Sequence, residues 1–182
     1  MPTLYLVRHG LAASAWDREI DPGLDALGRE QAASLVRELN SLAPVDLIVS
    51  PLARTRETAA PLAAAWQVEP RIEPRVGEIP SPVSGLAERG LWLREVATRA
   101  WPQMGKPLRQ WRGQVLMALA EIEGDAVVVS HYIAINAAVG AAVGDDRVVH
   151  FHPDHCSVTV LRSGAGRFEL VRRGAEAATR VL

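Results

Sequence analysis

Arg8 and His9 come directly after an apolar run, residues 4–7, near the start of the chain. An apolar run that stops at charged residues is typical of a buried strand that carries those residues to the edge of a sheet. Gly10 permits the chain to turn sharply away from such a strand. An arginine and a histidine in this position would also fit a surface ion pair, so this pair alone does not define a chemistry.

The same arrangement recurs twice later in the chain. Ser50 follows the run 45–49, which is apolar except for Asp46, and Arg54 comes four residues after Ser50. His131 lies two residues after the apolar run 126–129. Because ligands of open α/β sheets bind beyond the carboxyl ends of the strands, we expect these widely separated residues to meet in one pocket.

Two arginines and two histidines that converge near helix N-termini would form a binding site for an anion of high charge. Phosphate is the leading candidate, since four cationic or potentially cationic groups would over-compensate a single carboxylate. Carboxylate ligands and sulfate stay open at this point.

Strands and helices alternate along the sequence, which predicts a three-layer α/β/α sandwich with a mainly parallel central sheet. Asp25 is expected to cap the first helix, which stops before Pro44, and Ser50 is expected near the cap of the second. Residues 14–23 are expected to form a loop and residues 67–83, with four prolines, a rigid connector. The expected strands are 3–7, 45–49 and 125–130, with a hairpin of 157–161 and 167–171, and the expected helices cover 25–43, 50–65, 84–100, 108–123 and 133–143.

The length and composition suit one domain that spans residues 1–182. Within this domain, a helical excursion at about 84–123 is expected to cap the active site. The net charge is −1, so the chain lacks the large excess of positive charge that is expected for nucleic-acid binding. The apolar segment 132–144 is too short to span a bilayer, and the single cysteine, Cys156, fits a reducing compartment. These features predict a cytoplasmic protein with no nucleic-acid or membrane partner, and they leave the oligomeric state open.

Three blocks of the sequence resemble the histidine phosphatase superfamily, which includes the cofactor-dependent phosphoglycerate mutases and many small phosphatases. The order and spacing of the blocks agree with that family, and residues 21–32 resemble the segment that links the first two. The resemblance covers nearly the whole chain and implies a phosphoglycerate mutase-like fold. The blocks read Arg8-His9-Gly10, Ser50-Pro51-Leu52-Ala53-Arg54-Thr55-Arg56-Glu57-Thr58-Ala59 and Val128-Val129-Ser130-His131.

The resemblance implies a role for each residue of the expected pocket. His9 would attack phosphorus through a neutral ring nitrogen and form a phosphohistidine that water then hydrolyses. Arg8, Arg54 and His131 would bind the phosphoryl oxygens and offset charge in the transition state. No metal and no cofactor are implied, because the cationic side chains take the place of a metal.

The leaving alkoxide needs a proton, which calls for a carboxylic acid with a raised pKa at the pocket mouth. Glu78 aligns best with the position of the acid in the family. Glu73 is the alternative, and both could also be solvated charges of the connector. Two departures from the family pattern stand out: apolar residues follow Gly10 where relatives often carry phosphate-binding side chains, and Tyr132 replaces a frequent glycine.

The sequence therefore predicts a metal-independent phosphatase that acts on a small phosphorylated substrate through phospho-His9. The alternatives are a mutase-type phosphotransferase, a phosphohistidine or phosphoprotein phosphatase, and an inactive phosphate-binding regulatory module. The cluster of His150, His152 and His155 beside Asp154 suggests a metal site, but packing or surface roles are the more common ones for such loop histidines. A minor supporting role beside the pocket is also open to His155.

Overall fold

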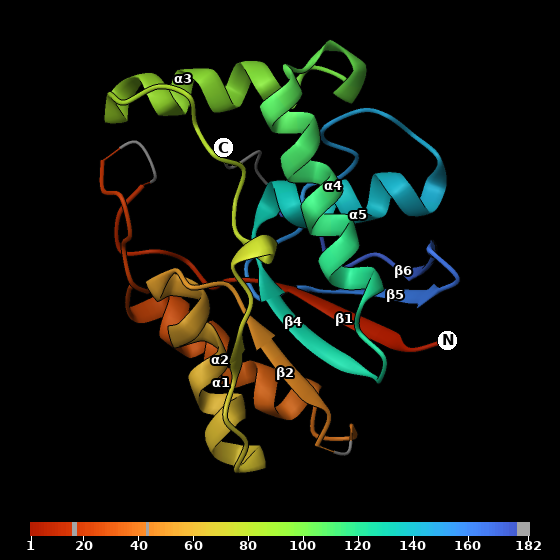
Figure 1. Cartoon of the computed structure of the whole chain (residues 1–182). Coiled ribbons are helices and arrows are strands. Elements are labelled where there is room, and N and C mark those ends of the chain that lie inside the picture. Colours follow the sequence, from red (N-terminus) through yellow and green to blue (C-terminus); the bar gives the residue numbers. More distant parts are fainter. Residues whose placement is uncertain (16–17, 43, 178–182) are drawn as a thin grey trace.

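The computed structural model describes residues 1–15, 18–42 and 44–177 and centres on a six-stranded sheet with the order β3-β2-β4-β1-β5-β6 (Figure 1). β1 and β2 both pair with β4 in parallel, and β3 continues the parallel set beside β2. β5 runs antiparallel to β1, and β6 runs antiparallel to β5. The strands are β1 (Thr3–Arg8), β2 (Asp46–Val49), β3 (Arg71–Ile72), β4 (Ala126–Ser130), β5 (Val158–Gly164) and β6 (Arg167–Arg172).

Helices cover both faces of this sheet, with α1 and α2 on one side and α4 and α5 on the other (Figure 1). α3 lies apart from the strands, at the top of the view. The helices are α1 (Ala26–Glu38), α2 (Ala53–Trp66), α3 (Leu86–Ala97), α4 (Lys106–Ala120) and α5 (Tyr132–Val143), and two 3₁₀ turns are η1 (Pro74–Val76) and η2 (Trp101–Gln103).

The alternation of side chains along β4 explains the three layers. Val128 packs into the core that contains residues of α4 and α5, whereas Val127 and Val129 pack into the core that contains residues of α1 and α2. All five residues of β4 are buried, as expected for a central parallel strand with helices on both faces. The predicted α/β/α sandwich with a mainly parallel sheet is confirmed.

Most of the expected elements appear within a few residues of their predicted bounds. Asp25 caps α1 as expected, since its carboxylate accepts a hydrogen bond of 2.6 Å from the amide of Gly28. α1 ends at Glu38, several residues before Pro44. Within the predicted loop 14–23 the described residues form no helix or strand, and positions 16 and 17 lie outside the described residues.

The structure adds detail to two expectations for local structure. Ser50 lies near the cap of α2 as expected: Leu52 is the N-cap residue, the helix starts at Ala53, and Oγ of Ser50 accepts a hydrogen bond of 3.3 Å from the amide of Leu52. The connector 67–83 also contains two elements that were not expected, β3, which pairs with Ile48 and Val49 of β2, and the turn η1. A strand of two residues is too short to show an alternating pattern in a sequence.

The described residues contain no helix of the length and apolar character needed to cross a membrane.

Candidate active site

The carboxyl ends of β1 and β4 lie side by side and bring the first and third sequence blocks together. Arg8 is the last residue of β1 and pairs with Ser130, the last residue of β4. The amide of His9 then donates a hydrogen bond of 3.1 Å to the carbonyl of Ser130. His131 follows as the N-cap residue of α5. The parallel pairing thus places His9 and His131 at the same edge of the sheet, with ring centroids 5.2 Å apart.

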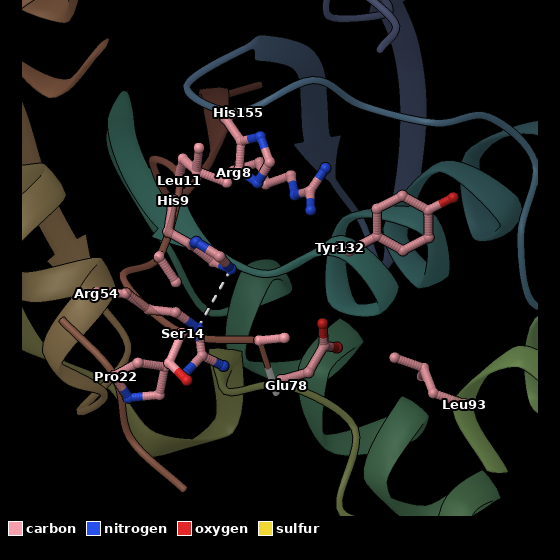
Figure 2. Close-up of a pocket in the computed structure, with 12 residues that line it drawn as sticks. Arg8, His9, Leu11, Ser14, Pro22, Arg54, Glu78, Leu93, Tyr132 and His155 are labelled. Carbon is pink, nitrogen blue, oxygen red and sulfur yellow. Dashed lines mark hydrogen bonds between the residues drawn. The ribbon is translucent and has the colours of Figure 1, made fainter. Parts of the chain in front are cut away.

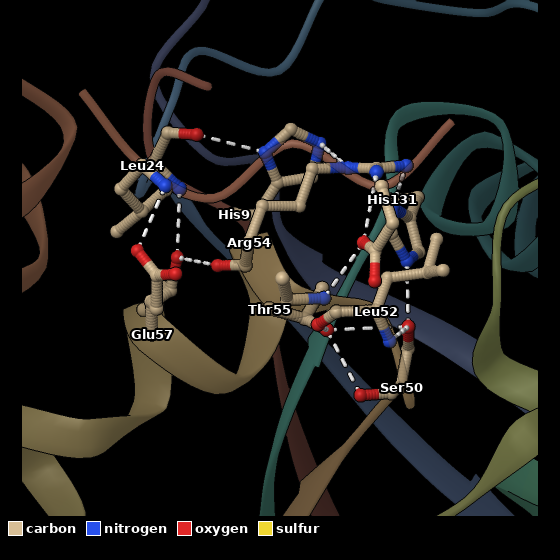
Figure 3. A network of polar contacts seen from close by, with 12 residues as sticks. His9, Leu24, Ser50, Leu52, Arg54, Thr55, Glu57 and His131 are labelled. Carbon is tan, nitrogen blue, oxygen red and sulfur yellow. Dashed lines mark hydrogen bonds and ion pairs between the residues drawn. The ribbon is translucent and has the colours of Figure 1, made fainter. Parts of the chain in front are cut away.

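The guanidinium of Arg54 lies between the two histidines. Its Nε donates to Nε2 of His9 and its Nη2 donates to Nδ1 of His131, each over 3.2 Å (Figure 3). Arg54 stands in the first turn of α2 and is 4% exposed. One planar side chain therefore joins the residues of all three sequence blocks.

These contacts define the protonation state of His9. Its Nδ1 lies 2.8 Å from the carbonyl oxygen of Gly10, which can only accept, so Nδ1 carries the proton. Its Nε2 accepts from Arg54 and therefore holds a lone pair. Burial, together with the nearby His131, Arg54 and Arg8, lowers the pKa of His9 well below its ordinary value. His9 is thus a neutral imidazole with Nε2 available as a nucleophile.

His131 has the opposite tautomer. Since Nδ1 accepts from Arg54, the ring proton lies on Nε2, which donates over 2.8 Å to Oγ of Ser50. Burial and the charges of Arg54 and Arg8 lower the pKa of His131 well below 6.5. Ser50 therefore orients the second histidine.

The backbone around His9 is tied to α2 through Thr58. The amide of Gly10 donates over 2.9 Å to Oγ1 of Thr58, whose hydroxyl donates over 2.6 Å to the carbonyl of Arg54. A Cβ atom on Gly10 would lie 2.7 Å from the carbonyl oxygen of Gly28, so this close approach requires glycine.

Both arginines keep buried donors that have no hydrogen-bond partner among the described residues, Nε of Arg8 and Nη1 of Arg54. Arg8 is anchored by a hydrogen bond of 2.8 Å from Nη1 to the carbonyl of Pro153, and its guanidinium lies 5.1 Å from the ring centre of Tyr132. Asp21 is the carboxylate at ion-pair distance from Arg54, 3.9 Å away. The site therefore holds more positive than negative charge and is suited to an anion.

Glu78 and Glu73 have contrasting surroundings. Burial raises the pKa of Glu78, although the amides of Ile79 and Ile133 donate to its carboxylate over 2.9 and 3.2 Å. Glu73 is bound by Nε and Nη2 of Arg75 over 2.9 and 2.8 Å, and these hydrogen bonds lower the pKa of Glu73. Glu78 is thus the carboxyl with the raised pKa that proton donation needs.

A cavity of about 280 Å³ opens above the histidines (Figure 2). Four of the residues expected at the site line it, namely Arg8, His9, Arg54 and Glu78. His131 is fully buried behind Arg54 and does not line the cavity in this state, and Glu73 does not line it either. The other described lining residues are Leu11, Ala12, Ser14, Ala15, Pro22, Leu93, Tyr132 and His155.

His155 lies closer to the reacting groups than the sequence indicated. Its ring centroid is 6.1 Å from that of His9, and burial, followed by the charge of Arg8, lowers its pKa to about 4. The signal in the sequence was its place just before the strand that pairs with β1, but its side-chain direction depends on the loop before β5. His152 instead contacts the hydroxyl of Tyr132, and His150 packs over Gly140 of α5. The described residues contain no group of three or more His, Cys, Asp or Glu arranged to hold a metal ion.

The sequence model of the histidine phosphatase superfamily (branch 1) matches residues 4–176. The chain belongs to this superfamily. The match includes the three sequence blocks that come together around Arg54.

Solved structures of similar fold cover almost the whole chain. Bacillus stearothermophilus YhfR is 22% identical, with a TM-score of 0.79 over 97% of this chain and 98% of its own. Entamoeba histolytica phosphoserine phosphatase is 18% identical, with a TM-score of 0.76 over 96% and 98%. A mycobacterial glucosyl-3-phosphoglycerate phosphatase is 21% identical, with a TM-score of 0.77 over 96% and 99%. At these identities the likeness shows the fold.

A curated relative is similar to part of the chain. A PE-PGRS family protein of Mycobacterium tuberculosis is 39% identical over 79 residues, which cover 40% of this chain and 14% of that protein. The matched part is thus a small fraction of the length of the curated relative.

We predict that both site histidines titrate well below pH 6.5 in the folded protein, with the proton of the neutral ring on Nδ1 of His9 and on Nε2 of His131. Because the unfolded chain protonates these rings near their ordinary pKa of about 6.5 and the folded chain does not, the free energy of unfolding should fall as the pH drops below about 6.5. Two-dimensional ¹⁵N NMR of the imidazole rings reports tautomer and charge directly. A titration midpoint at or above 6.5 for either ring would contradict the assignment.

Proposed function

We propose that the protein is a metal-independent phosphatase that hydrolyses phosphomonoesters through a phosphohistidine on His9. The observation that carries this proposal is the neutral His9 with its Nε2 lone pair beside two buried guanidinium groups, Arg8 and Arg54. A nucleophile surrounded by cations suits attack on a phosphoryl group, whose charge the same cations stabilise.

In the first step, the phosphoryl oxygens take hydrogen bonds from Arg8 and Arg54, and Arg54 exchanges its contact with Nε2 of His9 for a phosphoryl oxygen. The freed Nε2 attacks phosphorus, so that an N–P bond forms as the P–O bond to the leaving group breaks. The leaving oxygen takes the proton of the protonated Glu78 carboxyl. The raised pKa of Glu78 supports its role as this acid.

In the second step, the Glu78 carboxylate takes a proton from a water molecule that attacks phosphorus. The N–P bond breaks, its electron pair returns to Nε2, and phosphate leaves. Glu78 is protonated again and His9 is neutral, so the enzyme is ready for another turnover.

His131 would bind the phosphoryl group after Arg54 has moved. Its Nδ1 then loses the hydrogen bond from Arg54 and faces a dianion, which favours uptake of a proton at this atom. Because Nε2 keeps its hydrogen bond to Ser50, the ring retains its orientation while Nδ1 becomes a donor. His131 would thus supply charge stabilisation only when the substrate is bound.

A small organic phosphate fits the cavity best. The volume of about 280 Å³ is enclosed in part by Leu93 of α3, which supports the proposal that the helical excursion of residues 84–123 caps the active site of a single domain. The phosphoserine and glucosyl-3-phosphoglycerate phosphatases of similar fold are named for small phosphorylated substrates, in line with this substrate class.

The proposal predicts turnover of 4-nitrophenyl phosphate in the presence of a chelator and a covalent phosphoenzyme on His9. Rapid quenching with a ³²P-labelled substrate should trap label that is labile in acid and stable in base. His9→Gln should lose the label and lower kcat by at least about 10⁴-fold. His150→Gln is the matched control, because that ring packs over Gly140 of α5 and does not line the cavity. Phosphate binding without turnover would instead support a regulatory module.

Glu78→Gln should lower kcat/KM strongly for an alkyl phosphate, by about 10²-fold or more, and by less than about tenfold for 4-nitrophenyl phosphate. The reason is that a poor leaving group needs the proton and a good one does not. kcat/KM is the right quantity because it reports the first step, before water attacks. Glu73→Gln is the control, since Glu73 is bound by Arg75 away from the cavity. Equal losses on both substrates would contradict the role of Glu78 as acid.

A further inference from the structure

The walls of the cavity differ sharply in character. The charged lining residues, Arg8, Arg54 and Glu78, together with His9, are all engaged in the proposed phosphoryl chemistry. The rest of the lining is apolar or aromatic apart from Ser14 and His155, and the low pKa of His155, about 4, leaves that ring uncharged at neutral pH. The organic part of a substrate would therefore meet uncharged walls.

The position of Glu78 identifies the wall that the leaving group would contact. In Figure 2, Glu78, Tyr132 and Leu93 lie on the side of the cavity away from Leu11. Because the acid must reach the oxygen that leaves, the organic group attached to that oxygen must extend along the same side. Leu93 and Tyr132 are the apolar side chains of the cavity lining that stand there.

Tyr132 is held in place by contacts on both ends of its side chain. Its hydroxyl contacts Nδ1 of His152, and the guanidinium of Arg8 lies 5.1 Å from its ring centre. Leu93 comes from α3, on the far side of the cavity from the sheet. A fixed aromatic ring and a branched aliphatic side chain thus face the same space from two elements, an arrangement that favours a flat apolar group.

We propose that Leu93 and Tyr132 form an apolar leaving-group subsite that selects phosphate monoesters of apolar, aromatic-sized alcohols over esters that carry a second anionic group. This inference rests on the proposed phosphatase function and names the substrate class of the same site. A second carboxylate or phosphate would find no cation among the described lining residues other than Arg8 and Arg54, which hold the transferred phosphoryl group. Arg89 is near enough to Arg54 to lower the pKa of that guanidinium, but it does not line the cavity.

Three aryl esters whose leaving groups have similar acidity separate apolar contact from intrinsic reactivity: phenyl, 2-naphthyl and 3-carboxyphenyl phosphate. The second ring of the naphthyl ester adds apolar area, so its kcat/KM should exceed that of the phenyl ester about fivefold. The carboxylated ester should be about tenfold poorer than the phenyl ester, because its carboxylate would lose water without gaining a partner.

Leu93→Ala should lower kcat/KM for the naphthyl ester about fivefold and leave the phenyl ester within about twofold. Leu91→Ala is the matched control, since Leu91 is on the same helix but 62% exposed and does not line the cavity. Leu93→Lys should reverse the order of the phenyl and carboxylated esters by providing a cation at the subsite. This second variant still tests the subsite if alanine at this position disturbs α3.

The outcomes distinguish failure of the proposed subsite from failure of the proposed phosphatase function. If none of the three esters is turned over, both the phosphatase function and the subsite are overturned. If all three are turned over but the naphthyl ester has no advantage, or the carboxylated ester is preferred, the subsite is wrong while the phosphatase function stands. The same holds if Leu93→Ala and Leu91→Ala change all three esters equally.

Discussion

A buried arginine shared by two neutral histidines organises this protein. Arg54 donates one hydrogen bond to each ring, and burial, reinforced by the charges of Arg54 and Arg8, disfavours a proton on either histidine. Among the described residues, Asp21 is the one carboxylate at ion-pair distance from either buried guanidinium group, so the site has unbalanced positive charge. Such a site is most stable with an anion bound, which is the state that the proposed catalysis needs.

The fold makes this arrangement possible by placing strand ends together. β1 and β4 pair in parallel, so His9 and His131 leave the sheet at the same edge, and α2 starts close enough to insert Arg54 between them. Thr58 then fixes the backbone at Gly10, and Ser50 fixes the orientation of the His131 ring. The opposite wall of the cavity comes from α3 and the start of α5, so the proposed organic subsite and the proposed phosphoryl site are built largely from different elements.

The sequence predicted that Arg8, His9, Arg54 and His131 would converge, because each comes after a predicted strand. Hydrophobic runs, and the order of strands and helices, can be recognised from the local sequence alone. It did not predict the bridge through Arg54 or the burial of His131 behind it, since both depend on side-chain directions set by packing between distant elements. Ser50 was predicted near the cap of a helix, where it lies, but no sequence pattern indicated its hydrogen bond to His131. His155 likewise gave no sequence pattern that distinguishes a cavity wall from a surface loop.

The central claim, that the phosphoryl group is carried by His9, is tested most directly by the stereochemical course at phosphorus. A thiophosphate monoester made chiral with ¹⁶O and ¹⁸O, hydrolysed in ¹⁷O-enriched water, gives a chiral thiophosphate whose configuration can be measured. Each in-line displacement inverts phosphorus, so attack by His9 followed by attack by water predicts overall retention. Inversion would mean that water attacks the ester directly, and would contradict the account.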